Sequence, residues 1–241
     1  MEKVLTVENL IVEFKNKKSL FDKPSIKRVL NGVSFEINKG EIVGLVGESG
    51  SGKSTIAKSI LGLIPFEGRI ENYTARPQMV FQDPYSSLNP SKKVGWLLNE
   101  ALYLDGVKDK DIRKNKVEEM INLVGLSKEH LERYPNELSG GQRQRVCIAL
   151  SLISEPKLLL ADEPVSALDV TIQAQILELL KELYKKMDLS ILFISHDLRV
   201  VYNICDRVLI LKKGEIVESG TPKEVYQNPK HEYTKQLLDS I

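Results

Sequence analysis

The chain has 241 residues, enough for one large domain or two small ones, and its 34 Lys and Arg against 33 Asp and Glu leave a net charge of +1. This balance argues against nucleic-acid binding by bulk positive charge, and a hydrophobic content of 42% argues against disorder as the main state. Two cysteines exclude a disulfide scaffold, and no secretory signal or membrane-spanning apolar run is seen, so we expect a cytosolic chain.

The first third of the chain reads mainly as short strands. Apolar runs and two-residue alternation predict strands over residues 5–10, 11–14, 33–37, 42–46 and 79–81. Residues 15–27 are polar and contain Pro24, so a loop is expected there. The run 42–46 is almost wholly apolar, which is typical of a strand buried on both faces of a parallel sheet. A helix over 55–63 should follow it.

The middle of the chain has a helical pattern, and strands return after it. Residues 94–131 carry helical spacing and predict a helical insertion. Beyond it, helices are expected over 146–153 and 172–183, and strands over 158–161, 191–194, 208–211 and 216–217. Strands that alternate with helices predict an α/β fold with a largely parallel sheet covered on both faces.

A glycine-rich loop follows the strand at 42–46 and fits the pattern G-x-x-x-x-G-K-[ST]. Glycine lets the backbone approach a ligand closely, and successive N–H groups at a helix start can bind phosphate oxygens. Lys53 would bridge the β- and γ-phosphates of a nucleotide, and the Ser54 hydroxyl would ligate Mg²⁺. The predicted phosphate-binding residues are Gly47, Glu48, Ser49, Gly50, Ser51, Gly52, Lys53, Ser54 and Thr55.

Two further motifs carry candidate chemistry. Asp162 and Glu163 end an apolar strand, where Asp162 could hold Mg²⁺ through water and Glu163 could activate an attacking water; the pair could also be a helix cap or surface turn. Residues 138–142 read Leu-Ser-Gly-Gly-Gln before a helix that begins at about residue 143. This run could be a plain helix cap or a second anion site, which would suggest that two chains share each nucleotide.

The phosphate loop, Leu-Ser-Gly-Gly-Gln and Asp162-Glu163, in this order along the chain, closely resemble the motifs of the nucleotide-binding subunits of ABC transporters. Gln82 resembles the family's Q-loop glutamine, residues 166–169 with Asp169 resemble its D-loop, and His196 resembles its switch histidine. Phe14 falls where the family has an adenine-stacking aromatic residue, more often Tyr, and Phe21 is a competing candidate. The resemblance implies a phosphate-loop NTPase core with a mostly parallel sheet, an antiparallel N-terminal β subdomain and an inserted helical subdomain.

The resemblance also implies a mechanism, cofactors and partners. Two such domains close head to tail around two ATP, each held by the Lys53 loop of one chain and by Ser139, Gly140, Gly141 and Gln142 of the other. Glu163 acts on water, His196 contacts the γ-phosphate, and Gln82 responds to Mg²⁺ and to the transport pore; the implied Mg²⁺ ligands are Ser54, Gln82 and Asp162. The implied partners are a second, non-identical ATPase, two transmembrane permease subunits and an extracytoplasmic substrate-binding protein, without nucleic acid, at the cytoplasmic face of the cell membrane.

Residues 81–90, 169–176 and 228–238 are similar to the peptide/nickel import subfamily, although Glu232 stands where that subfamily often has Pro. The chain lacks the longer C-terminal extension of many peptide members. This difference favours uptake of nickel or a metal chelate, and di- or oligopeptides are the other expected cargo. The alternative function is a soluble ABC-type ATPase that acts on ribosomes or DNA. One ATPase domain is expected over 1–241, with a core of 1–93 and 145–220, a helical subdomain at 94–144 and a tail at 221–241. His130 and His231 show no partners in the sequence.

Overall fold

The computed structural model describes residues 2–16 and 25–239. The chain divides into two compact units, which are described separately below. The first unit joins the N-terminal segment Met1–Ala75 to the C-terminal segment Ser190–Ile241, and the second unit is Arg76–Leu189. In the described ranges, no helix is both long enough and apolar enough to cross a lipid bilayer.

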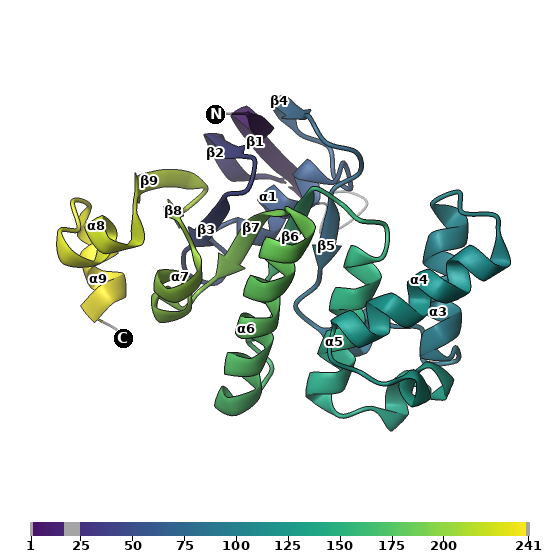
Figure 1. Ribbon diagram of the computed structural model, residues 1–241. Helices are drawn as coiled ribbons and strands as arrows, with labels where there is room; N and C mark the ends of the chain where they lie inside the picture. Colours follow the sequence, from purple (N-terminus) through teal and green to yellow (C-terminus); the bar gives the residue numbers. More distant parts are fainter. Residues whose placement is uncertain (1, 17–24, 240–241) are drawn as a thin grey trace. The chain divides into compact units, whose positions relative to one another are not determined.

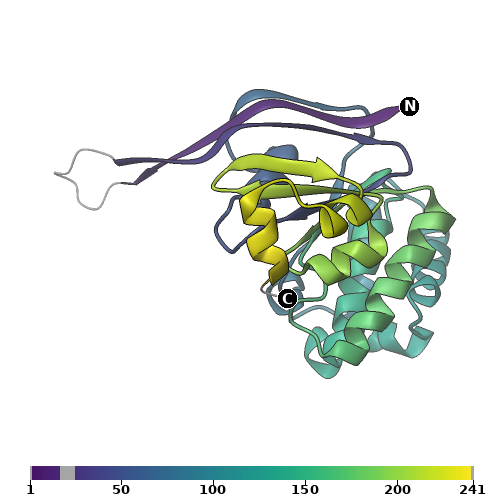
Figure 2. The same cartoon turned by 90° about the vertical axis from the view of Figure 1, so that its left-hand side faces the viewer.

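An antiparallel sheet forms the N-terminal part of the first unit. It consists of β1 (Lys3–Asn16), β2 (Ser25–Asn38) and β4 (Glu67–Asn72), in the order β2-β1-β4. Figure 2 shows β1 and β2 side by side along their length. The two strands expected over 5–14 are therefore one strand, with a shift of register between Val7 and Leu10 where Asn9 has a φ of 50°. Of the loop expected over 15–27, the ends belong to strands, because β1 continues to Asn16 and β2 begins at Ser25, and its remaining part lies outside the described residues.

The first unit also contains parallel strands. Here β3 (Ile42–Val46) pairs in parallel with both β7 (Ser190–Ser195) and β8 (Arg207–Lys212), while β9 (Glu215–Gly220) is antiparallel to β8. Every residue of β3 and β7 is buried, as expected for strands covered on both faces. The helices of this unit are α1 (Lys53–Ile60), α7 (Leu198–Ile204), α8 (Pro222–Gln227) and α9 (Glu232–Asp239), shown in Figure 1.

The second unit combines two parallel strands, β5 (Gln78–Val80) and β6 (Leu158–Asp162), with most of the helices (Figure 1). The longest helix, α6, buries Ile176, Leu179, Leu180 and Leu183, which share one face at helical spacing. The helices of this unit are α2 (Pro84–Ser87), α3 (Val94–Leu104), α4 (Lys110–Leu123), η1 (Lys128–Glu132), η2 (Pro135–Glu137), α5 (Gly140–Leu152) and α6 (Val170–Met187).

The observed elements confirm the expected α/β class, with an antiparallel N-terminal sheet, parallel strands and a run of helices in the middle of the chain. Of the boundaries that differ from expectation, two bear on the candidate site. Helix α1 begins at Lys53, directly at the end of the glycine-rich loop, and α5 begins at Gly140, within the Ser-Gly-Gly run. Both helices therefore start on residues of the predicted phosphate-binding motifs. The proposed subdomain boundaries remain a prediction.

Candidate nucleotide-binding site

The phosphate loop connects the end of β3 to the start of α1 within the first unit. Its first residue must be small, because a Cβ on Gly47 would lie 2.2 Å from the backbone oxygen of Leu211. At the other end of the loop, Gly52 is the N-cap of α1 and has a φ of 114°, a backbone conformation that residues other than glycine rarely adopt. Two glycines of the motif are thus required by the path of the backbone.

The polar groups of this loop are suited to an anion. Lys53 is only 6% exposed, and its Nζ donates to the backbone oxygens of Gly47 at 2.6 Å and Glu48 at 3.0 Å. The Ser51 hydroxyl is buried and has no hydrogen-bond partner within the described residues. No described side chain caps α1, so the N–H groups of its first turn keep their capacity to bind an oxygen ligand. A lysine, an orphaned hydroxyl and uncapped N–H groups together fit a nucleotide phosphate.

His196 lies at the same edge of the first unit's parallel strands as the phosphate loop. Val46 of β3 pairs with Ser195 of β7, so Gly47 and His196 both follow directly after paired residues. The His196 side chain is exposed, and the next residue, Asp197, caps α7 by accepting from the Arg199 N–H at 2.8 Å. The structure therefore brings His196 and the phosphate loop to one edge, where ligand sites of α/β sheets lie.

The second unit brings Gln82 and Glu163 together. Val80 of β5 pairs with Ala161 of β6, and Gln82 and Glu163 each lie two positions beyond this pair. The Gln82 Nε2 donates to the Glu163 Oε2 at 3.0 Å. Glu163 also has a φ of 46°, an uncommon backbone conformation that is concentrated at functional sites. Asp162, one position earlier, is 5% exposed at the end of β6.

The Ser-Gly-Gly-Gln motif, called the signature motif below, forms the start of α5. Ser139 is the N-cap, and its Oγ accepts from the Gln142 N–H at 3.3 Å while its own N–H donates to the Gln142 Oε1 at 3.1 Å. A Cβ on Gly141 would lie 2.8 Å from the Ile172 Cγ2, and one on Gly140 would lie 3.7 Å from the Leu168 Cδ2. The glycines therefore pack closely on the segment that follows Glu163.

Arg143 and His130, to which the sequence assigns no role, hold this motif in place. The buried Arg143 donates to the backbone oxygens of Pro135 at 3.0 Å and Leu138 at 3.1 Å, and its guanidinium lies 3.7 Å from the centroid of the Tyr85 ring. His130 contacts the signature glutamine itself, with 3.2 Å between its Nε2 and the Gln142 Nε2. The expectation that His130 has no partner is thus wrong. His130 lies in η1, twelve positions before Gln142, and no pattern in the sequence indicates this contact.

His130 contacts Gln142 through one ring nitrogen and Ser127 through the other. Because the Gln142 Oε1 accepts from the Ser139 N–H, the Gln142 Nε2 faces the His130 Nε2. On the other side of the ring, the Ser127 N–H donates to the His130 Nδ1 at 3.2 Å, and the Ser127 Oγ lies 2.9 Å from the same nitrogen. The imidazole therefore links the start of η1 to the start of α5.

The candidate Mg²⁺ ligands are all oxygen donors, the type that this ion prefers. Ser54 is half-buried in the first turn of α1, Asp162 is buried at the end of β6, and Gln82 is exposed. A hydroxyl, a carboxylate and an amide oxygen fit an ion that takes its other ligands from phosphates and water. When bound, Mg²⁺ would neutralise phosphate charge.

The remaining predicted residues have well-defined positions. Phe14 is 43% exposed on β1, so its ring has a free face for stacking, whereas Phe21 lies outside the described residues. The Asp169 carboxylate accepts from the Ile172 N–H at 3.0 Å and caps α6. The adjacent Val170, the first residue of α6, is 81% exposed. Neither cysteine is reactive: both are buried, and burial raises the pKa of the Cys147 thiol to about 12.

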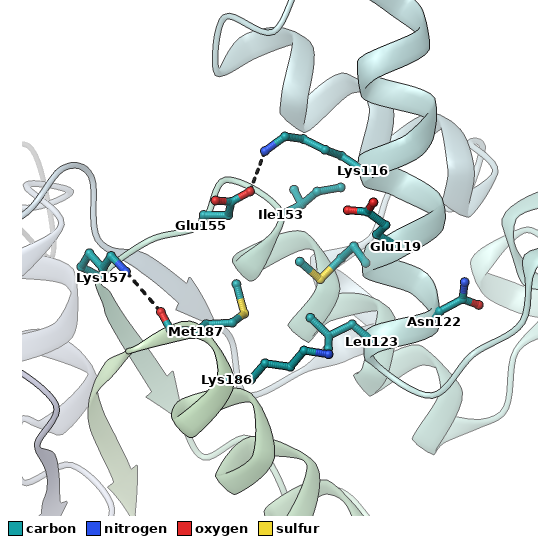
Figure 3. Close-up of a pocket in the computed structure, with 10 residues that line it drawn as sticks. Lys116, Glu119, Asn122, Leu123, Ile153, Glu155, Lys157, Lys186 and Met187 are labelled. Carbon is teal, nitrogen blue, oxygen red and sulfur yellow. Dashed lines mark hydrogen bonds and ion pairs between the residues drawn. The ribbon is translucent and has the colours of Figure 1, made fainter.

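A separate cavity of about 740 Å³ lies in the second unit (Figure 3). Its apolar lining includes Met120 and Ile153, and its rim carries an ion pair of 2.5 Å between Lys116 and Glu155. Lys157, also on the rim, donates to the backbone oxygen of Met187 at 3.2 Å. None of the residues predicted to bind nucleotide lines this cavity. The motifs predicted to bind nucleotide therefore lie outside this cavity.

Comparison with known proteins relates these motifs to one family. A model of the ABC transporter family matches residues 30–166, more than half of the chain. The oligopeptide transport ATP-binding protein OppF of Streptococcus mutans is 47% identical, over 96% of this chain and 81% of its own length. The dipeptide transport ATP-binding protein DppF of Lactococcus lactis is 45% identical, over 98% of this chain and 83% of its own length.

Solved structures agree with the fold. The chain is similar to cbiO1 of Clostridium perfringens, part of the ABC transporter complex cbiONQ, with a TM-score of 0.79 and 28% identity over 95% of this chain and 92% of the other. It is also similar to the ATP-binding cassette MJ0796, solved as a dimer in a post-hydrolysis state with ADP and Pi, with a TM-score of 0.78 and 27% identity over 90% of this chain and 98% of the other. With the family model, close relatives and fold in agreement, the chain belongs to the ABC transporter family, as one of its ATP-hydrolysing subunits.

Proposed function

We propose that this ATPase drives an importer of dipeptides or oligopeptides. The observation that carries the proposal is the identity of 45–47% to peptide-transport ATP-binding proteins over nearly the whole chain. The relatives named above carry peptide names, and neither names nickel, so the lean toward nickel that chain length suggested is not supported. They are also transport proteins, which does not favour the alternative of a soluble ATPase acting on ribosomes or DNA.

Within this function, the phosphate loop is assigned to the β- and γ-phosphates of ATP, with Lys53 as the cation. Support comes from the buried Ser51 hydroxyl and the start of α1, to which the described residues supply neither a hydrogen-bond partner nor a side-chain cap. Ser54, Asp162 and Gln82 are assigned to Mg²⁺, and Phe14 to the adenine ring. His196 is assigned to the γ-phosphate because it emerges beside the loop on a neighbouring strand.

Glu163 is assigned to the attacking water, as general base or orienting group. Its carboxylate has a defined direction, because the Gln82 amide donates to one oxygen and an unusual φ fixes the backbone. As general base, this carboxylate would accept the proton of the attacking water. Gln82 would in turn transmit a change at this carboxylate to the exposed residues on either side of it in the chain, of which Phe81 and Tyr85 are 44% and 67% exposed.

The signature residues Ser139, Gly140 and Gly141 are assigned to the ATP of a second ATPase subunit. Support comes from the N-terminus of α5, a helix of 13 residues whose first N–H groups lie at the two glycines. The exposed Val170 and the capping Asp169 would lie in the contact between the two ATPases. ATP binding would then close the head-to-tail dimer, and loss of the γ-phosphate would open it.

The further partners proposed are two permease subunits and an extracytoplasmic substrate-binding protein, with this chain at the cytoplasmic face of the membrane. The test is mass spectrometry of the proteins that copurify with the chain from its own gently solubilised membranes. Two multi-span proteins, a second ATPase and a capture protein are the expected set. Ribosomal or DNA-repair proteins in their place would refute the transport function and leave the ATPase function intact.

Cargo is tested by uptake into cells that carry either the wild-type chain or its Lys53→Ala variant. Labelled dipeptide, labelled oligopeptide and a labelled Ni²⁺ chelate are offered separately. Peptide uptake that depends on Lys53 supports the proposal. Lys53-dependent uptake of nickel without peptide uptake would overturn it.

A further inference from the structure

The C-terminal tail carries a dense set of polar contacts that the function above does not use. Glu218 of β9 accepts three hydrogen bonds from it: from the N–H groups of Lys230 and His231, both at 2.9 Å, and from the Thr234 hydroxyl at 2.5 Å. Thr234 is fully buried. One carboxylate therefore fixes the start of α9 against the edge strand of the first unit.

His231 and Tyr233 continue this arrangement. The His231 Nδ1 accepts from the Tyr233 N–H at 3.0 Å, so this histidine caps α9 and is not without a partner, contrary to expectation. The Tyr233 side chain is 3% exposed, and the Lys212 ammonium lies 4.7 Å from the centroid of its ring. The ring is thus held in place, with its hydroxyl directed inward.

That hydroxyl reaches the phosphate loop. The Glu48 N–H donates to the Tyr233 hydroxyl oxygen at 3.0 Å, across 185 positions of sequence. On the other side of the same residue, the Glu48 backbone oxygen accepts from the Lys53 Nζ at 3.0 Å. The backbone of Glu48 is therefore held by the tail through its N–H and by the nucleotide-binding lysine through its carbonyl.

We propose that Tyr233 is a positioning residue for ATP: the tail, anchored on Glu218, holds the phosphate loop at Glu48 in the conformation that binds the nucleotide. A loop N–H without its acceptor must find another partner, and the loop then samples conformations with poorer phosphate contacts. Loss of the Tyr233 hydroxyl should therefore weaken ATP binding and leave the rate of the chemical step unchanged. This inference rests on the proposed function of the phosphate loop.

The test compares two tyrosines of the same tail in the full chain. Tyr233→Phe removes the hydroxyl that Glu48 uses and keeps the buried ring. Tyr226→Phe removes a hydroxyl that has no hydrogen-bond partner within the described residues, and it serves as the matched control. The ATP dissociation constant is measured by calorimetry, and KM and kcat are measured for the assembled ATPase. Tyr233→Phe should raise the dissociation constant and KM about fivefold to twentyfold, with kcat within twofold of wild type.

A second variant acts through the anchor. Thr234→Val removes the hydroxyl that binds Glu218 and keeps the side-chain volume nearly constant. It should raise KM by a smaller factor than Tyr233→Phe does. This variant also tests the proposal if Tyr233→Phe does not fold. A wild-type KM in folded Tyr233→Phe would overturn the proposal, and so would a wild-type KM in Thr234→Val if Tyr233→Phe does not fold. An equal rise in Tyr226→Phe would do so too, because the effect would then be a general property of the tail.

Lys53→Ala separates this inference from the proposed function on which it rests. If Lys53→Ala binds ATP as tightly as wild type, the assignment of the phosphate loop fails. If Lys53→Ala loses ATP while Tyr233→Phe keeps wild-type affinity, the assignment stands and only the role of the tail is refuted.

Discussion

The Gln82 amide donates a 3.0 Å hydrogen bond to the Glu163 carboxylate, across 81 positions of sequence. The two residues meet because β5 and β6 are parallel and in register, so that loops leaving their carboxyl ends lie at the same edge. Gln82 belongs to a segment with exposed aromatic side chains. Its contact with Glu163 therefore links that segment to the proposed catalytic carboxylate. A displacement of that segment would therefore change the direction of the Glu163 side chain.

Glu163→Gln is expected to abolish turnover and preserve ATP binding. The amide keeps the volume of the side chain and a hydrogen bond with Gln82, but it cannot accept a proton from water, so kcat should fall by about 10²-fold to 10⁴-fold. The ATP-bound dimer should accumulate, as measured by light scattering with ATP present. Glu155→Gln, which loses only an ion pair with Lys116, is the control. Unchanged ATPase activity in Glu163→Gln would remove this residue from the mechanism.

Ser139→Arg is expected to stop hydrolysis without weakening ATP binding by the isolated chain. The substitution places a long cation where the partner's nucleotide is proposed to bind, and it removes the hydroxyl that caps α5. Calorimetry on the isolated chain and ATPase assays on the assembled complex separate the two effects. Normal turnover would contradict the shared site.

Two substitutions at His130 distinguish its contact with the signature motif from its local capping role. Asn at position 130 retains a polar group near the position of Nδ1, beside Ser127, while Gln retains an acceptor near the position of Nε2, opposite Gln142. His130→Asn should lower kcat about threefold to tenfold, the effect of one lost hydrogen bond, and His130→Gln should stay near wild type.

The matching double variant is His130→Asn combined with Gln142→Ala. If the histidine acts through Gln142, the double variant should be no slower than Gln142→Ala alone, as in a double-mutant cycle of coupled residues. Additive losses, or equal losses in His130→Asn and His130→Gln, would show that the contact does not position the motif.

Stability should depend on pH through Glu41. Burial tends to raise the pKa of this carboxyl, but hydrogen bonds from Arg207 and Asn38 outweigh it and hold the pKa below its ordinary value of 4.5. A carboxyl whose pKa is lower in the folded chain stabilises the fold above its unfolded pKa, and this stabilisation is lost as pH falls through the folded pKa. Glu41→Gln should therefore lower the free energy of unfolding by about 1–2 kcal/mol at pH 7.

The measurement is urea unfolding of wild type and Glu41→Gln at several pH values. The difference between the two proteins should shrink as pH falls below 4.5, because wild-type Glu41 then becomes protonated. A difference that is the same at pH 7 and at pH 3 would exclude an electrostatic contribution from this carboxylate.

Several elements could be predicted because their signals are local. The buried strands β3, β6 and β7 follow from continuous apolar runs, and α6 follows from apolar residues at helical spacing. Strand β4 was missed, because Glu67–Asn72 contains two acids, an arginine and a glycine and is exposed over half its length. It is a strand only because it pairs with β1, a contact between distant segments.

The sequence by itself determined the chemistry of this protein. The phosphate loop, the Ser-Gly-Gly-Gln motif and Asp162-Glu163 are recognisable because each depends on residue types at short, fixed spacing, and a strand or helix beside the motif can be read from the same stretch. Only the tertiary structure decided which side chains support these motifs. Tyr233 reaches Glu48, Gln82 reaches Glu163 and His130 reaches Gln142 through strand pairing and helix packing. Periodicity tells which face of an element is buried, but it carries no information about which distant loop that face will meet.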